Sequence, residues 1–157
     1  MISYKDLNGL DVDLSFEENK FNIEARHVLV VLKHEGKWLL TEHRERGVEF
    51  PGGKVEEWET LEEAAIRETV EETGVTISKL EKFAEYVVHD ADPFCKAVFT
   101  GSVVQINKSF TRRETAGVVW MTDTELNSFG NLSFHMKDAG MSAIRKWVDA
   151  YDYGWVD

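Results

Sequence analysis

The sequence predicts an α/β protein in which helices cover both faces of a mixed β-sheet. Three observations lead to this prediction. A nearly continuous apolar run at residues 27–33 is typical of a strand that is buried on both faces. Segments rich in apolar and β-branched residues follow a helix that is predicted to begin after Thr60. A second amphipathic helix is predicted near the C-terminus, at residues 136–151.

The remaining elements follow from turn signals and alternation. Residues 3–16 are predicted to form a hairpin, because Asn8-Gly9 is a strong two-residue turn and apolar residues alternate with polar ones after it. A turn at Glu35-Gly36 separates the apolar strand from a strand at 38–41, and a polar loop follows at 42–47. Later strands are predicted at 75–80, 83–88, 94–104 and 117–121, with a short helix at 124–127. We expect residues 1–157 to form one domain.

Composition narrows the class of protein. The net charge of -11 argues against a surface for duplex DNA, which relies on basic side chains. The single cysteine, Cys95, excludes an intrachain disulfide and fits a reducing compartment. The N-terminus lacks the features of a signal peptide, and the longest apolar run is too short to span a bilayer. We therefore expect a cytoplasmic protein without a membrane partner.

The helix at residues 61–73 has clear start and stop signals. Thr60 is a good N-cap, and Glu63 completes a capping box. Gly74 is expected to end the helix, because glycine adopts the left-handed conformation that a helix C-terminus often requires.

Three glutamates of this helix are expected to lie on one narrow arc. Glu68, Glu71 and Glu72 are spaced i, i+3 and i+4, so their like charges repel one another. Apolar residues begin the same arc and form a second stripe on roughly the opposite side: Leu61, Ala64, Ala65, Ile66 and Val70. We therefore expect a helix covered on both sides, with its carboxylates in a partly enclosed place. Such a cluster suits Mg²⁺ or Mn²⁺, although a solvated acidic helix would explain the glutamates alone.

The spacing around these glutamates is more specific. Gly53 is followed after five residues by Glu59 and after seven more by Arg67-Glu68, Glu71-Glu72 and Gly74-Val75. This spacing resembles the Nudix box, G-x5-E-x7-R-E-U-x-E-E-x-G-U, at every fixed position of residues 53–75. Thr69 stands where an aliphatic residue is usual, and its methyl group can pack there. The resemblance implies the Nudix α/β/α sandwich, with a mixed central sheet and a loop-helix-loop catalytic motif, over about residues 25–150.

The resemblance also implies roles for individual residues. In Nudix hydrolases the carbonyl corresponding to Gly53 commonly binds a metal ion, and Glu71 and Glu72 match the principal carboxylate ligands. Glu68 matches a residue that either joins the metal ligands or acts as general base, and the choice of base between Glu68 and Glu71 stays open. Arg67 pairs with a box glutamate, here Glu59. The implied cofactor is Mg²⁺, with Mn²⁺ as an alternative.

One further metal ligand is expected from outside the box. Nudix enzymes often supply an acidic ligand from the loop before a late strand, and Glu114 lies six residues before Trp120. A solvated acidic residue in a loop is the alternative interpretation of Glu114.

The implied reaction is hydrolysis of a nucleoside diphosphate linked to another group. The segment EFPGGK at residues 49–54 resembles MutT-like enzymes, which cleave oxidised guanine triphosphates to monophosphate and pyrophosphate. The EHRERG and FHMKD segments also resemble bacillar MutT-like proteins of the 8-oxo-dGTP diphosphatase type. On this resemblance Phe50 would stack on the base, with a buried loop aromatic as the alternative, and Asn131 would read the purine.

Basic residues near the box are candidates for binding the distal phosphates. They are His43, Arg44, Arg46 and Lys54, and an ordinary charged loop explains them equally well. The expected partner is a small nucleotide.

Other substrates and another class of protein remain open at this point. The same reaction centre would serve a pyrophosphohydrolase of triphosphorylated RNA 5′ ends, or an enzyme that cleaves ADP-ribose or dinucleoside polyphosphates. A non-catalytic nucleotide sensor belongs to a different class. Such sensors usually lose box carboxylates, whereas this sequence retains them, so catalysis is favoured.

Overall fold

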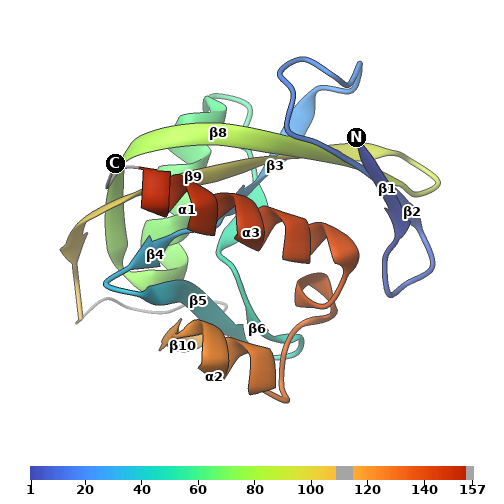
Figure 1. The fold of residues 1–157 in the computed structure, drawn as a ribbon. Coiled ribbons are helices and arrows are strands. Elements are labelled where there is room, and N and C mark those ends of the chain that lie inside the picture. The colour runs from blue at the N-terminus through green and yellow to red at the C-terminus, as the bar shows by residue number, and fades with distance from the viewer. Residues whose placement is uncertain (109–114, 155–157) are drawn as a thin grey trace.

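The computed structural model describes residues 1–108 and 115–154, which form a mixed sheet between helices, as predicted (Figure 1). The larger sheet has the strand order β1-β2-β8-β9-β3-β7, in which β3 and β9 are parallel and the other neighbours are antiparallel. Its strands are β1 (Ile2–Lys5), β2 (Asp11–Ser15), β3 (Ala25–Val30), β7 (Gly52–Lys54), β8 (Val75–His89) and β9 (Phe94–Ile106). The smaller sheet contains β4 (Lys33–His34), β5 (Lys37–His43), β6 (Gly47–Glu49) and β10 (Thr115–Met121).

Helices lie on both faces of the larger sheet. They are α1 (Leu61–Thr73) and α3 (Ala139–Gly154), with a 3₁₀ turn, η1 (Phe134–Met136), before α3. The short helix α2 (Asp123–Ser128) lies beside β10 of the smaller sheet. Figure 1 shows α3 in front of the long strands β8 and β9, and α1 behind them. None of the helices in the described part of the chain is long and apolar enough to cross a lipid bilayer.

Side-chain alternation along β3 and β9 divides the core into two parts. Val28 and Ala97 are paired and point toward α1, where they pack with Ala64 and Ala65. The next pair, Leu29 and Val98, points the other way and packs with apolar residues of α3, which are Met141, Ile144 and Val148. Every residue in both groups is at most 8% exposed, so each face of the sheet buries an apolar layer.

Helix α1 begins and ends as predicted. Thr60 accepts a hydrogen bond from the Glu63 N–H, and the Glu63 carboxylate accepts one from the Thr60 N–H, which completes the capping box. Gly74 ends the helix with a left-handed φ of 73°. The expectation of cover on both sides is wrong, because Val70 is 39% exposed. The helix is buried through Ala64, Ala65, Thr69 and Thr73 instead.

Two further element boundaries differ from the prediction. Helix α3 begins at residue 139 rather than 136, since the Asp138 carboxylate accepts a hydrogen bond from the Met141 N–H (2.9 Å), as an N-cap does. The strands predicted at 75–80 and 83–88 form one strand, β8, with irregular pairing to β9 between them. Lys79 lies at this irregularity and has a positive φ of 51°. The prediction divided the segment into two strands at this point.

The predicted N-terminal hairpin is confirmed, and it extends the larger sheet next to β8. The Tyr4 ring lies against Gly140 in the first turn of α3, so closely that a Cβ at Gly140 would overlap the ring. The hairpin is therefore held against α3 as well as against the sheet.

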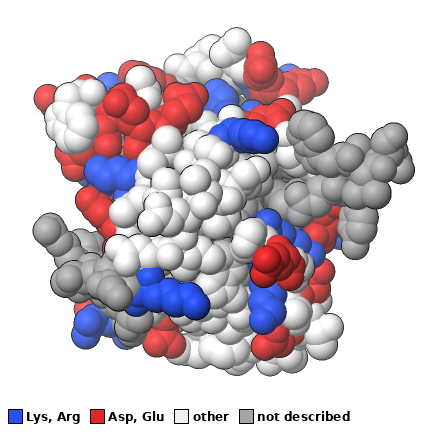
Figure 2. All heavy atoms as spheres, turned by 90° about the vertical axis from the view of Figure 1, so that its left-hand side faces the viewer, with Lys and Arg blue, Asp and Glu red and all other residues white. Residues whose placement is uncertain are grey.

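Charge is unevenly distributed over the surface. Figure 2 shows a broad uncharged area on the face at the left of Figure 1, with acidic and basic side chains around it. Strand β9 ends with the exposed apolar residues Val104 and Ile106. The described part of this face shows no continuous basic stripe.

Candidate active site

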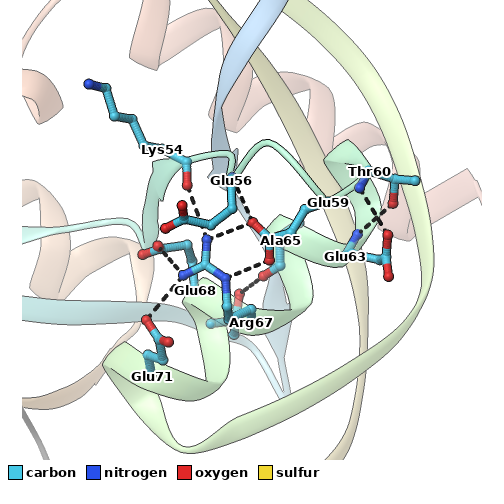
Figure 3. A network of polar contacts seen from close by, with 10 residues as sticks. Lys54, Glu56, Glu59, Thr60, Glu63, Ala65, Arg67, Glu68 and Glu71 are labelled. Carbon is cyan, nitrogen blue, oxygen red and sulfur yellow. Dashed lines mark hydrogen bonds and ion pairs between the residues drawn. The ribbon is translucent and has the colours of Figure 1, made fainter.

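Arg67 organises the acidic residues of the box (Figure 3). Its Nε and Nη2 donate to the two carboxylate oxygens of Glu59 at 2.6 and 2.8 Å, which is a bidentate pair. Nη2 also donates to the Lys54 carbonyl oxygen at 3.1 Å. Hydrogen bonds from Arg67 lower the pKa of Glu59, and those from Arg67 to Glu59 raise the pKa of Arg67. Both groups therefore stay charged near neutral pH.

The third nitrogen of the guanidinium group contacts two other box glutamates. Arg67 Nη1 donates to Glu68 Oε1 at 2.8 Å and to Glu71 Oε2 at 3.2 Å. The Glu68 side chain is 14% exposed and the Glu71 side chain 50% exposed. One cation thus lies among three carboxylates and offsets the repulsion that the helical spacing of Glu68 and Glu71 predicts.

The glycines of β7 bring the backbone against these carboxylates. Gly53 pairs with Val28, and a Cβ at Gly53 would lie 2.5 Å from Glu68 Oε2. The neighbouring Gly52 N–H donates to Glu72 Oε2 at 3.1 Å. The Glu68 carboxylate occupies the space that a side chain at position 53 would fill, so only glycine fits there while that carboxylate keeps its place.

The donor set fits a hard divalent cation. Carboxylate oxygens of Glu68, Glu71 and Glu72 project from one side of α1 beside the backbone of Gly53, and Mg²⁺ and Mn²⁺ prefer such oxygen ligands. In residues 1–108 and 115–154, however, no three His, Cys, Asp or Glu side chains gather around one point. Arg67 Nη1 bridges two of the carboxylates. The fifth predicted ligand, Glu114, lies outside the described residues.

A groove lies on the opposite face of the sheet, the face toward α3. It consists of two adjoining cavities of about 160 and 110 Å³, and both are lined by Tyr86, Lys96, His135 and Met141. The larger cavity extends along the N-terminal hairpin, where Tyr4 lines it. The smaller cavity extends to both glycines of β7, so the groove reaches the box.

The structure brings two of the predicted substrate-binding residues to this groove. Phe50 lines the smaller cavity, is 3% exposed and contacts Trp38 edge-on with 5.7 Å between ring centroids. Arg46 lines the same cavity and forms a bidentate pair with Glu49 at 2.7 and 3.2 Å. Both assignments to substrate binding stay predictions.

The other predicted substrate-binding residues do not line the groove. Arg44 is exposed on the turn between β5 and β6. The Lys54 side chain points away from the Arg67 network in Figure 3, and only its carbonyl oxygen contacts that network. Asn131 is exposed, and its carbonyl oxygen accepts a hydrogen bond from the Val48 N–H at 2.9 Å. Their roles also stay predictions.

Sequence reasoning missed several residues of the groove. Burial would raise the pKa of Glu49, but hydrogen bonds from Arg46 and Ser133 outweigh that effect, and its pKa is lowered. Burial and the charge of Lys96 lower the pKa of His135 to about 4, so His135 is neutral at pH 7. A signal for Lys96 existed, because it is the only charged residue in the segment FCKAVF, but nothing in the sequence indicated which residues would face it.

Comparison with known proteins identifies the family. Residues 23–146 match the family model described as "NUDIX domain". The chain is 37% identical over 160 residues to the Bacillus subtilis protein named "Putative 8-oxo-dGTP diphosphatase YtkD", and the match covers all of both chains. The crystal structure of the Bacillus subtilis pyrophosphohydrolase BsRppH is 36% identical, covers all of both chains and has a TM-score of 0.87.

A more distant solved structure agrees on the fold. A NUDIX hydrolase from Nitrosomonas europaea is 21% identical over 83% of this chain and 90% of its own, with a TM-score of 0.65. The box residues, the fold and these full-length matches lead to one conclusion: the chain belongs to the Nudix family of pyrophosphohydrolases.

Proposed function

We propose that this protein hydrolyses nucleoside 5′-triphosphates to monophosphate and pyrophosphate with a divalent metal ion, and that an oxidised purine such as 8-oxo-dGTP is its preferred base. The observation that carries the proposal is the Arg67 network. It gathers Glu59, Glu68 and Glu71 on one side of β7, with Glu68 next to Gly53. The groove on the other face of the sheet reaches the same strand.

The metal ion would be held by the Gly53 carbonyl and by carboxylates of Glu68, Glu71 and Glu72. A bound Mg²⁺ or Mn²⁺ neutralises phosphate oxygens and lowers the pKa of water. Arg67 cannot serve as an acid, because its raised pKa keeps the guanidinium protonated, so its role is to hold the carboxylates in position. Glu68 or Glu71 positions the attacking water and accepts its proton.

The groove is a better place for the nucleoside than a second cavity, which lies on another part of the surface. That cavity, about 520 Å³, lies beside residues 19–26 and the loop before α1. Its lining includes the acidic side chains Glu24, Glu56, Glu57, Glu59 and Glu85, which would repel phosphates. The groove also has acidic residues in its lining, but it adds Arg46, Lys96 and aromatic rings that can contact a base, and it reaches Gly53 of the box.

The preference for an oxidised purine is supported by similarity. The full-length relative YtkD is named for 8-oxo-dGTP, and the EFPGGK segment resembles MutT-like enzymes. The second candidate substrate is a triphosphorylated RNA 5′ end. It is favoured by the second cavity along the hairpin, which provides space beyond the part of the groove next to the box.

A substrate panel with two variants tests the proposal. The panel contains the common nucleoside triphosphates, 8-oxo-dGTP, ADP-ribose and 5′-triphosphorylated RNA, each assayed with Mg²⁺ and with Mn²⁺ for release of pyrophosphate or phosphate. We expect Glu71→Gln and Glu72→Gln to reduce metal-dependent turnover by orders of magnitude, because each removes a carboxylate charge from the site. Glu62→Gln is the matched control, since Glu62 is exposed in the first turn of α1, outside the network.

Two outcomes would reject parts of this proposal. Undiminished turnover in both variants would reject the assigned site. Equal turnover of all triphosphates would reject the preference for an oxidised purine. A non-catalytic sensor is distinguished by thermal melts, in which nucleotide would raise the Tm of the wild-type protein while no substrate is cleaved.

A further inference from the structure

Strand β9 is longer than the strand that pairs with its second edge. On one edge it pairs with β8 from Phe94 to Ile106. On the other edge it pairs with β3 only as far as Phe99, whose carbonyl oxygen also accepts a hydrogen bond from the Val31 N–H at 2.8 Å. No strand in the described part of the chain pairs with this edge over residues 100–106. Figure 1 shows this end of β9 at the margin of the molecule.

The backbone of this segment is suited to pairing with another strand. Every second residue of a strand points its N–H and C=O groups to the same edge. Gly101 and Val103 therefore continue the edge that Phe99 presents to β3. The side chains of Val104 and Ile106 are 60% and 38% exposed. An exposed apolar edge of this kind is a template for another chain.

The other edge strands of the two sheets are protected in ways that this part of β9 is not. Strands β1, β4, β6 and β7 are two to four residues long, and each contains a charged residue. Residues 117–121 of β10, a longer edge strand, are buried or half-buried. Residues 100–106 contain neither a charged side chain nor a proline, and residues 104–106 are all exposed. Short length, charge and proline prevent edge pairing, so the open part of β9 lacks the usual protection.

Charge indicates which partner fits this edge. The chain has a net charge of -11, so two copies repel each other where acidic surfaces meet. Figure 2 shows a broad uncharged area on the side of the molecule at which β9 ends in Figure 1. A second copy can approach this side without that repulsion. Antiparallel pairing of a strand with its own copy also needs no other surface, because both copies contribute the same residues.

The two ends of the segment carry opposite charges. Glu81 on β8 pairs with Thr100 at one end, Lys108 follows the strand at the other, and both charged residues are exposed. An antiparallel arrangement centred near Val103 turns the second copy end for end, so Lys108 of one copy lies toward Glu81 of the other. A parallel arrangement would instead bring like charges together. The charges therefore favour a second copy in antiparallel orientation.

We propose that residues 100–106 of β9 pair antiparallel with the same residues of a second copy, which joins the larger sheets of two molecules into one continuous sheet. The interface is isologous, so it closes as a dimer and does not continue into a fibre. We expect a Kd of about 1–100 μM, because one short strand pair buries less surface than a standard interface.

Sedimentation velocity over a range of protein concentrations measures this self-association. The wild-type protein should change from monomer to dimer as the concentration rises. Val104→Lys puts a positive charge on the open segment of each copy and should raise the Kd at least about 10-fold. Leu7→Lys is the matched control, since Leu7 is 56% exposed on the hairpin turn, and its Kd should equal that of the wild-type protein. Thermal melts show that both variants are folded.

Charge reversal tests the antiparallel orientation. Glu81→Lys and Lys108→Glu should each raise the Kd about two- to fivefold, the range of exposed ion pairs. The double variant restores opposite charges across the interface, so its Kd should return to within about twofold of the wild-type value. An unchanged Kd in both single variants would overturn the antiparallel arrangement.

Hydrogen exchange locates the interface. The amides of Gly101 and Val103 should exchange more slowly at concentrations above the Kd than below it. Equal protection at all concentrations would mean that the chain itself covers the edge and would overturn the proposal. A wild-type protein that stays monomeric up to about 1 mM would overturn it too, as would a dimer that Val104→Lys leaves intact. None of these measurements uses a substrate, so their results are independent of the proposed hydrolysis.

Discussion

The two faces of the larger sheet differ in how their charged side chains are paired. On the α1 side, Arg67 contacts Glu59, Glu68 and Glu71 directly, so the cation and its carboxylates are paired within the protein. On the α3 side, Lys96 lines a groove together with Glu49 and Asp138, and its Nζ lies 5.8 Å from the centroid of the Tyr86 ring. The first arrangement is complete within the chain, whereas the second is suited to a partner from outside.

This difference follows from how the two regions are assembled. The box side is built by one contiguous segment, β7 to α1, whose loop and helix place its residues together. The groove side is built by the hairpin, β8, β9 and the residues from η1 to the start of α3. We infer that local structure organises the catalytic groups, while long-range packing shapes the part that contacts the nucleoside. The predictions below test this division.

The largest effect is expected for Gly53→Ala on the box side. The new Cβ would lie 2.5 Å from Glu68 Oε2, so the flexible end of Glu68 must move away from its position beside Arg67. We expect kcat to fall by about 10- to 100-fold, the usual effect of disturbing groups that orient metal ligands. Steady-state kinetics and a thermal melt measure the two consequences separately.

Because the displaced atoms belong to a flexible side chain, the Tm of Gly53→Ala should change little. Gly130→Ala is the matched control, since no atom lies within 4 Å of its added Cβ and its φ is not positive. Activity of Gly53→Ala equal to that of Gly130→Ala would contradict the close packing of glycine and carboxylate as a functional requirement.

An intermediate effect is expected for Gly140→Ala on the groove side. Alanine normally stabilises a helix relative to glycine by up to about 1 kcal/mol. Here the new Cβ overlaps Tyr4, so we expect a loss of about 1–3 kcal/mol and a severalfold rise in KM as the hairpin shifts. Urea unfolding and steady-state kinetics provide the measurements.

A second-site variant identifies the cause of that effect. In a Tyr4→Ala background the overlap is removed, and Gly140→Ala should become neutral or stabilising. Additive changes in the free energy of unfolding would show that the hairpin does not depend on this contact.

The smallest effect concerns pH. Arg67 lowers the pKa of Glu59, so this pair stabilises the folded state at pH values above the unfolded pKa of Glu, about 4.3. The contribution is lost as pH falls through the lower pKa of the folded state. We therefore expect Arg67→Met to reduce the free energy of unfolding more at pH 6 than at pH 3.

Urea unfolding of both proteins at the two pH values tests this prediction. Other titrating groups, such as His135, are present in both proteins, so their contributions largely cancel in the comparison. An equal loss at pH 3 and pH 6 would mean that the charge of Glu59 does not contribute to the pair.

Local signals in the sequence were sufficient for α1 and the box. Thr60, Glu63 and Gly74 defined the helix ends, because caps depend on residues three or four positions apart. The helical period then placed Glu68 and Glu71 within reach of Arg67, and the predicted pair with Glu59 is present. The same local signals did not show that Val70 would be exposed, since burial depends on which strands pack against the helix.

Only the tertiary structure determined the groove. Lys96 appeared in the sequence as one charge in an apolar strand, and Tyr4 as part of a hairpin outside residues 23–146 that match the family. Both residues line one cavity with His135, and this depends on the order and register of the strands and on where α3 begins. The physical reason is range: caps and helical faces arise from neighbouring residues, whereas a cavity arises from surfaces that approach only when the whole chain packs.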